Sequence, residues 1–395
     1  MPILFYLWIA FALNYIDRQM VYSMFPALER DLAFSAVALG WVGTVFLWSY
    51  TPILPLAGLL ADRYKRNKII FWSLLLWSVA TIGCGLSQSP AIFLFWRVVM
   101  GLTEALYYPT AMALIASHYP EAARSRALGL HQSAQYTGGV IGGWYGGWAA
   151  DHTGWRSAFL IAGAAGLLYS PWLKRGLPDS PPPPSSSTEK VNPWALVKST
   201  PFLILAATFS AYCSIQWIFF AWFPTYLQDR FHLSMTDSGW ASTLFVQTAI
   251  IVGIFLGAYL GDRTQSRLLV TAAGAFLCAP FSYFAFSAES LPLSLTFAAT
   301  FGFFAGGLSA NAFAGAFDLV DPRLRGFAAG ILNMCGGFAS GGMILIAGML
   351  RKTVGFAPLL FVAMITTMLL ATLLAIFAGR AKITQSSPAD EPSRV

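Results

Sequence analysis

Long apolar segments recur along the whole chain, and they limit its possible folds more than any other feature. Each is about 20 residues long, enough for a helix rising about 1.5 Å per residue to cross roughly 30 Å of hydrocarbon. The segments are continuously apolar, whereas the strands of a membrane barrel alternate between apolar and polar residues. We therefore predict an all-α membrane protein with twelve transmembrane helices. The predicted spans are 3–27, 38–60, 68–87, 91–116, 125–150, 156–174, 201–227, 238–261, 267–286, 291–318, 325–350 and 356–379.

Composition supports this prediction and sets the topology. Hydrophobic residues make up 57% of the 395 residues and charged residues only 10%. Seventeen of the 24 Lys and Arg residues fall in loops and termini on one side of the predicted bundle, and five fall on the other. Because short cytoplasmic loops retain basic residues, both termini are expected in the cytoplasm and the protein in the inner (plasma) membrane. The net charge of +7 follows from this topology, so no nucleic acid partner is expected.

Two similar loops divide the twelve spans into six and six. Residues 58–66 read GLLADRYKR and follow the second span, and residues 261–267 read GDRTQSR and follow the eighth. Matching loops at matching positions indicate a duplicated six-helix unit, an arrangement in which transporters place a substrate site between the repeats.

The predicted organisation therefore has two pseudo-symmetric bundles. We expect an N-terminal six-helix bundle at 1–174, a cytoplasmic linker at 175–200, a C-terminal bundle at 201–379 and a disordered cytoplasmic tail at 380–395. The linker is rich in Pro and Ser and cannot bury a core. Glycines recur every four positions in the fifth and eighth spans, which predicts close helix packing, either one that forms and loosens during transport or static packing.

Several other classes of function have no support in the sequence. The four cysteines are scattered singly and the four histidines form no cluster, so no metal site is expected. No phosphate-binding loop and no hydrolase motif occurs in the chain, so neither an enzyme nor an ATP-driven pump is expected. We expect no cofactor, and a monomer.

Four charged residues lie inside the predicted spans: Asp17, Arg18, Arg97 and Glu104. A charge near the bilayer centre costs at least about 2.5 kcal/mol, so such residues usually face a partner or a water-filled cavity. Arg97 and Glu104 are seven residues apart and share one helix face, separated by about 10.5 Å along the axis. Asp17 and Glu104 are expected near the midplane, and Arg97 about two turns closer to the outside.

Three segments, taken with the 58–66 loop, carry a resemblance to a known family. The loop and the twelve spans resemble the major facilitator superfamily (MFS). Within that superfamily, NYIDR at 14–18, RVVMGLTEA at 97–105 and WFPTYL at 222–227 look like the anion:cation symporter family. Spinster-type lipid transporters share the first pattern and the Arg-to-Glu spacing of the second.

The buried charges and this resemblance together imply a division of roles. We expect Asp17 and Glu104 to take up protons, and Arg18 or Arg97 to bind an anionic substrate carboxylate, since a guanidinium can grip a carboxylate through two hydrogen bonds. A desolvated carboxylate binds protons more readily, and a nearby arginine opposes this, as a proton switch requires. The alternative is that the acidic and basic residues only neutralise each other to stabilise the bundle.

Further site residues follow from the resemblance alone. Tyr50, Gln135 and Asn333 occupy positions that look substrate-facing, although each could instead serve helix packing.

The 58–66 loop is also given a role by the resemblance. In it Gly58, Asp62, Arg63 and Arg66 are expected to form a cytoplasmic gate that stabilises the outward-open state; the alternative is that their charges only set the topology.

The sequence therefore predicts a secondary transporter that works by rocker-switch alternating access. The expected activity is proton-coupled symport of a small organic anion, such as a sugar acid or another carboxylate. The alternatives are a Spinster-type (lyso)lipid transporter and a sodium-coupled anion symporter.

Overall fold

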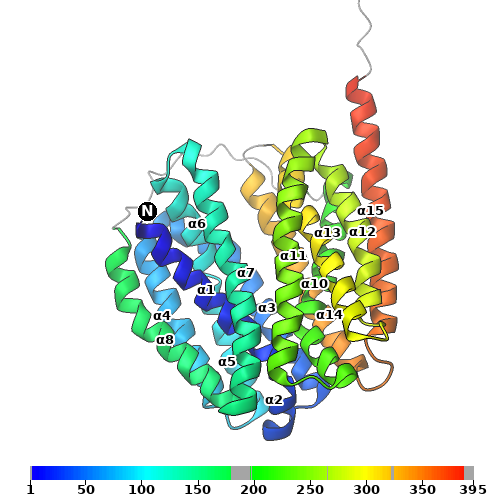
Figure 1. The fold of residues 1–395 in the computed structure, drawn as a ribbon. Helices are drawn as coiled ribbons and strands as arrows, with labels where there is room; N and C mark the ends of the chain where they lie inside the picture. The colour runs from blue at the N-terminus through cyan, green and yellow to red at the C-terminus, as the bar shows by residue number, and fades with distance from the viewer. Residues whose placement is uncertain (1, 179–195, 197, 265, 322–323, 387–395) are drawn as a thin grey trace, which may run out of the picture.

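The computed structural model describes residues 2–178, 196, 198–264, 266–321 and 324–386, and these residues are almost entirely helical (Figure 1). The N-terminal half comprises α1 (Pro2–Ser23), α2 (Phe25–Leu32), α3 (Ala36–Arg63), α4 (Arg66–Gly85), α5 (Pro90–Glu104), α6 (Tyr107–His118), α7 (Glu121–His152) and α8 (Trp155–Gly176). The C-terminal half comprises α10 (Thr200–Phe231), α11 (Met235–Thr264), α12 (Arg267–Ala285), α13 (Leu291–Asp318), α14 (Arg325–Leu350) and α15 (Ala357–Ser386).

The predicted all-helical membrane architecture is confirmed, and the helices can be assigned to spans. Within the described part of the chain, nine helical stretches are long and apolar enough to cross a membrane, one of them formed by α5 and α6 together. The helices α1, α7 and α8 have a similar length, but polar residues, glycines and aromatic residues lower their hydropathy. Because α1 and α7 pack along each other, their polar faces lie inside the bundle. With these three, the count of about twelve holds.

Local sequence explains where several helices begin. Ser35 and Ser89 cap α3 and α5, each accepting a hydrogen bond from a backbone N–H three residues later. Gly154, with φ of 87°, makes the turn between α7 and α8, a conformation that residues with a side chain rarely adopt.

The predicted spans 91–116 and 356–379 coincide with membrane-length helical stretches at Pro90–His118 and Ala357–Gly379. Two details differ: the fourth span contains a break, and the first part of the tail predicted to be disordered is helical. The fourth span is interrupted between α5 and α6, because Pro109 has no N–H to donate to the carbonyl of Ala105 and its ring crowds that carbonyl. The last helix continues to Ser386 rather than ending at 379. Hydropathy marks the membrane edge, whereas a helix continues into water until a breaker such as Pro388 approaches. Most of the predicted linker, and 387–395 of the tail, lie outside the described residues.

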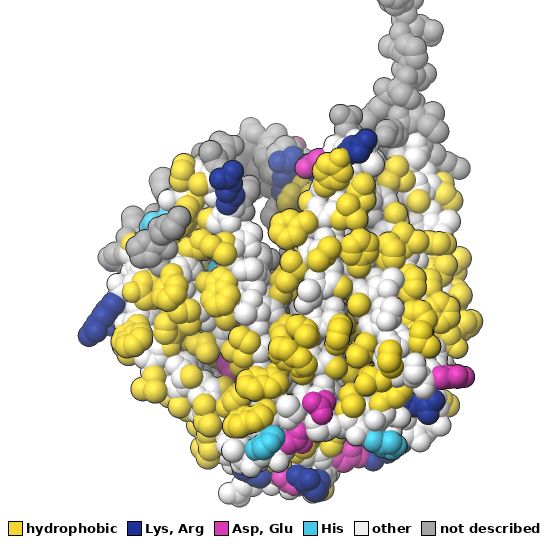
Figure 2. Space-filling view, in the orientation of Figure 1, with side chains coloured by type: hydrophobic (Ala, Val, Ile, Leu, Met, Phe, Trp, Pro, Cys, Tyr) yellow, Lys and Arg dark blue, Asp and Glu magenta, His cyan; other side chains and the backbone are white. Residues whose placement is uncertain are grey.

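The two halves form separate lobes, joined along two helix pairs (Figure 1). One pair is α7 with α11, and the other is α3 with α14. Figure 2 shows hydrophobic side chains covering the outer faces of both lobes, with charged side chains gathered toward the two ends of the bundle. This distribution matches a bundle surrounded by lipid.

Glycines of α7 serve two different interfaces. Gly139, Gly143 and Gly147 face α11 across the halves, where an added Cβ would overlap Gln247, Gly239 and Met235. The neighbouring stripe, one residue earlier in each turn, faces α1 within the same half. On α11, the predicted glycine stripe lies against α13 rather than against the other half; its members are Gly253, Gly257 and Gly261. The prediction of close packing is thus confirmed, partly between and partly within the halves.

Contacts between the halves concentrate at one end of the bundle. Along α3 and α14 they run from Gly40 against Leu345 to Thr51 against Gly337. Beyond that point Gly58 and Gly330 have open space around them, with nothing within 4 Å of an added Cβ. Both ends of the described chain lie at this open end (Figure 1), and Figure 2 shows a hollow between the lobes there. We call this end the terminal side and the opposite end the closed side.

A leucine at Gly147 is expected to force the closed side apart. A side chain there would collide with the backbone carbonyl of Met235, and overpacking costs about 1–3 kcal/mol, each 1.4 kcal/mol or so shifting an equilibrium about tenfold. Thr44 is buried between the halves, so a cysteine at this position reports whether the closed side opens. In a variant whose four native cysteines are replaced by serine, the introduced Thr44→Cys thiol should react with a membrane-impermeant maleimide about tenfold faster when Gly147→Leu is also present.

Gly326→Leu is the matched control, since Gly326 lies in open space. An equal increase in both variants, or none in Gly147→Leu, would contradict the assigned interface.

Candidate functional site

The four intramembrane charges predicted from the sequence all lie buried in the N-terminal half. Helix α1 carries Asp17 and Arg18, and α5 carries Arg97 and Glu104; none is more than 5% exposed. Because charges buried in a bundle need partners, their contacts decide what the site can do.

The central contact is an ion pair between Arg18 and Glu104. The Arg18 Nε donates to Glu104 Oε2 at 2.6 Å, and the two side chains are 6% and 0% exposed. The second carboxylate oxygen, Oε1, has no hydrogen-bond partner among the described residues. Glu104 is the last residue of α5, directly before the interruption caused by Pro109. The pairing thus joins two helices, and neither Asp17 with Arg18 nor Arg97 with Glu104 forms the neutralising pair considered from the sequence.

Aromatic rings enclose the Arg18 guanidinium. Its central carbon lies 4.4 Å from the ring centroid of Tyr50, 4.9 Å from that of Tyr15 and 5.1 Å from that of Phe46. Such contacts contribute about 0.5–2 kcal/mol each, more where water is excluded. The structure therefore brings Tyr50, one of the predicted site residues, directly onto Arg18.

Arg97 contacts the same phenylalanine as Arg18. Its guanidinium carbon lies 4.7 Å from the ring centroid of Phe46. Its Nε donates to Val42 O at 3.4 Å and its Nη1 to Met100 Sδ at 3.1 Å, while Nη2 has no partner among the described residues. Arg97 is fully buried, one and a half to two turns nearer the closed side than Glu104. In this conformation Arg97 is thus not exposed to solvent.

Asp17 is held by a third helix. Thr81 on α4 donates its hydroxyl to Asp17 Oδ2 at 3.2 Å, and Asp17 interacts electrostatically with both Glu104 and Arg97. One turn before Arg18, the buried Asn14 has an amide group without a hydrogen-bond partner in the described residues. The amide of Asn14 therefore remains able to form hydrogen bonds beside the ion pair.

Gln135 and Asn333 lie where the two halves part. Gln135 is half-buried on α7, one turn beyond Gly139, and Asn333 is exposed on α14, one turn beyond Gly337. Those glycines make the last contacts before the open end. The Asn333 side chain donates to Ala329 O of its own helix at 3.0 Å. No contact described here joins either residue to Arg18, and both face the space between the halves.

Sequence reasoning missed the tyrosines Tyr15 and Tyr108 near the site. Tyr15 lies against the Arg18 guanidinium, and the Phe11 ring packs against both tyrosines, with ring centroids 5.2 Å from Tyr15 and 5.6 Å from Tyr108. Tyr15 was noticed only as part of the 14–18 segment. Because the chain has 15 tyrosines and helical spacing alone does not tell which face the centre, only Tyr15 carried any sequence signal.

The predicted gate residues make contacts within their own half. Arg66 is 3.8 Å from Asp62 and donates to the backbone carbonyls of Ala61 and, on α6, Ala113. Arg63 is exposed, and Gly58 has open space beside it.

The second loop repeats this geometry in the other half. Arg267 lies 3.8 Å from Asp262 and 3.2 Å from Asp318 on α13. With the terminal side open, the basic residues of both loops thus contact other helices of their own half, α6 in the first and α13 in the second.

Ion pairs outside the membrane join the halves on the closed side. Glu29 on α2 binds Arg351, at 3.2 Å, and Lys352, which follow α14. Arg351 also pairs with Asp229 of its own half at 2.9 Å. Partial burial raises the pKa of Glu29, but its hydrogen bond with Lys352 and the charge of Arg351 outweigh this and lower the pKa below its ordinary value of 4.5.

Two helical halves that touch at one end, one of them holding a buried ion pair, are typical of a multi-pass membrane transporter, a class without enzymatic chemistry. The chain belongs to the Major Facilitator Superfamily, whose family model matches residues 7–343. This confirms the predicted family.

Known relatives narrow the resemblance. A probable galactarate/D-glucarate transporter of Bacillus subtilis is 26% identical, with 89% of this chain and 86% of the relative aligned. A D-galactonate transporter of Escherichia coli is 23% identical over 90% of both chains. A probable sulfoacetate transporter of Cupriavidus necator is 28% identical over 67% of this chain and 65% of the relative. All three are named for organic anions, as the resemblance to anion transporters predicted.

Solved structures agree with the fold. A bacterial homolog of the human lysosomal transporter Spinster, in an inward-facing and unoccupied conformation, superposes with a TM-score of 0.79 over 98% of both chains at 20% identity. The occupied inward-facing form also gives 0.79, at 21% identity over 96% of both chains. At this identity the likeness establishes the fold alone.

The Arg18–Glu104 pair is expected to behave as one energetic unit. Removing one partner of a buried pair costs about 3–5 kcal/mol because the other charge is left uncompensated. Glu104→Leu and Arg18→Leu should each lower the melting temperature in detergent strongly. The loss in the double variant should be much smaller than the sum of the two single losses. Strictly additive losses would show that the two residues are uncoupled.

Acid is expected to loosen the closed side through Glu29. The pKa of Glu29 is lower when its ion pairs are formed than when the closed side is open. The ion pairs therefore favour the closed state fully above about pH 4.5, the ordinary pKa, and this effect is lost as the pH falls through the lowered pKa. Spin labels at Arg30→Cys and Arg230→Cys, in the cysteine-free background, should move apart at acid pH, and already at pH 7 in Glu29→Gln. Asp237→Asn, whose carboxylate contacts Ser234 of its own half, should leave the distance unchanged; if it widens the gap equally, Glu29 has no special role.

Proposed function

We propose that the protein is a proton-coupled symporter of a small organic anion, with sugar acids as the first candidates. The relatives named for galactarate, glucarate and galactonate support the substrate class. The observation that carries the proposal is the Arg18–Glu104 ion pair, in which a proton-accepting carboxylate occupies the anion-binding face of a guanidinium.

In this proposal, Arg18 binds the substrate carboxylate. Its guanidinium is always charged and presents a fork of donors that matches two carboxylate oxygens. Glu104 uses only the Nε edge of that fork. The neighbouring Tyr15 and Tyr50 suit a polyhydroxylated substrate, because each hydroxyl can donate to and accept from a sugar hydroxyl.

Proton and substrate then bind cooperatively. A proton on Glu104 removes its charge and weakens its hold on Arg18, which frees the guanidinium for the substrate carboxylate. Conversely, a substrate bound to Arg18 removes the charge that keeps Glu104 ionised. By linkage, each ligand raises the affinity for the other by the same factor. Asp17, held by Thr81, serves as the second proton-accepting group.

Alternating access would expose the site to one side at a time. By the positive-inside rule the terminal side faces the cytoplasm, so this structure is inward-open, in the plasma membrane of a cell, with both termini inside. When the halves rock, the contacts of Glu29 and the α7–α11 glycines separate, and Arg97 becomes reachable from outside. The gate of Gly58, Asp62, Arg63 and Arg66 would then engage the opposite half. We propose that a single chain suffices.

The decisive experiment is uptake into proteoliposomes. A panel of labelled sugar acids, monocarboxylates and lysolipids is offered with an inward proton gradient, a sodium gradient or neither. We expect one carboxylate class to accumulate with the proton gradient only. Glu104→Gln should abolish accumulation yet retain exchange of internal for external substrate, because glutamine mimics the protonated carboxylate and cannot release a proton.

Glu289→Gln makes the same chemical change at an exposed position and should transport normally. Accumulation that depends on the sodium gradient would show that sodium, not the proton, is the coupling ion. Transport of lysolipid alone would show that the substrate is a lipid. Wild-type-like accumulation by Glu104→Gln would remove the proposed switch.

A further inference from the structure

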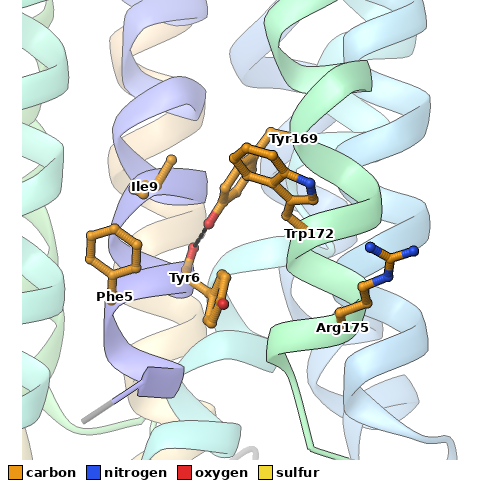
Figure 3. Close-up of a pocket in the computed structure, with 6 residues that line it drawn as sticks. All are labelled: Phe5, Tyr6, Ile9, Tyr169, Trp172 and Arg175. Carbon is orange, nitrogen blue, oxygen red and sulfur yellow. Dashed lines mark hydrogen bonds between the residues drawn. The ribbon is translucent and has the colours of Figure 1, made fainter.

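A groove on the outer face of the N-terminal half runs between the start of α1 and the end of α8 (Figure 3). Its volume is about 430 Å³, and it is lined by Phe5, Tyr6, Ile9, Tyr169, Trp172 and Arg175. Phe5 and Trp172 are 63% and 65% exposed, far more than aromatic side chains that face a protein core. The site lies away from the space between the halves, so the transport mechanism does not use it.

The shape of the groove is set by fixed contacts. The Tyr169 hydroxyl donates to the backbone carbonyl of Tyr6 at 2.9 Å, which ties α8 to α1 (Figure 3). The Tyr6 ring lies directly over Gly176, where any Cβ would overlap it. Because α1 and α8 belong to the same half, movement between the halves leaves this geometry intact.

The lining combines an apolar wall with one cation at its end. Arg175 follows Trp172 by three residues, about 4.5 Å farther along α8 toward the terminal side. Trp, Tyr and Arg at helix ends are typical of the boundary between hydrocarbon and lipid headgroups. No carboxylate within the described part of the chain pairs with Arg175, so its guanidinium retains its donors.

We propose that this groove binds one anionic glycerophospholipid of the leaflet at the terminal side. One acyl chain lies against Phe5, Ile9 and Trp172, and the lipid phosphate accepts hydrogen bonds from Arg175. A free phosphate would leave the apolar wall uncovered. A zwitterionic lipid has no net charge to match the guanidinium, whereas an anionic lipid satisfies both features.

Native mass spectrometry of the delipidated full-length protein tests this directly. Phosphatidylglycerol and phosphatidylcholine with the same acyl chains are titrated separately, and the affinity of the first bound lipid is measured. The wild type should prefer phosphatidylglycerol. Arg175→Gln should weaken its first binding event about fivefold, the effect of one basic residue near a lipid phosphate, and leave phosphatidylcholine unchanged. Arg175→Lys should retain most of the preference.

Two further variants separate the headgroup from the acyl chain. Trp172→Ala should weaken both lipids, since it removes apolar wall. Lys198→Gln removes an exposed positive charge near the start of α10, outside the groove, and should change neither. The proposal fails if Arg175→Gln keeps the full preference for phosphatidylglycerol, or if Lys198→Gln loses as much. Melting temperatures equal to that of the wild type would confirm that the surface variants are folded.

Discussion

The cost of holding charge inside a bilayer governs this structure. Arg18 and Glu104 are both buried, and either one alone would be severely unfavourable, so the pair fixes α1 against the end of α5. An apolar pair would stabilise the bundle at least as well. In the mechanism proposed above, the pair is useful because it is conditional: one proton on Glu104, or one anion on Arg18, would remove the reason for the contact.

The surroundings of the pair make that condition effective. Aromatic rings flank the guanidinium, and Glu104 accepts a hydrogen bond from its Nε. Phe46 contacts both arginines, and Arg97 is fully buried. The interruption at Pro109 places Glu104 at a helix end rather than in an unbroken turn. Local backbone chemistry and long-range packing thus converge on the same carboxylate.

The interfaces lie either within a half or between the halves. On α7, one glycine stripe packs against α1 of the same half, and the stripe beside it packs against α11 of the other half. In the alternating access proposed above, the first interface would persist, whereas the second would be reversible and separate as a unit. Ion pairs of Glu29 reinforce the reversible interface from the aqueous side, where charges are solvated when they part and their separation is inexpensive.

The sequence by itself determined the helical membrane fold, the two halves, the family and the four charges of the site, because hydropathy, loop repetition and intramembrane charge are properties of residues read along the chain. It also located the glycine stripes and predicted that helices pack closely there, but not which helix each stripe contacts. Only the tertiary structure decided that Glu104 pairs with Arg18, that Thr81 and a set of tyrosines complete the site, and which glycines face the other half. Those facts depend on the rotation and crossing of helices packed side by side, which many residues set together and no single segment encodes.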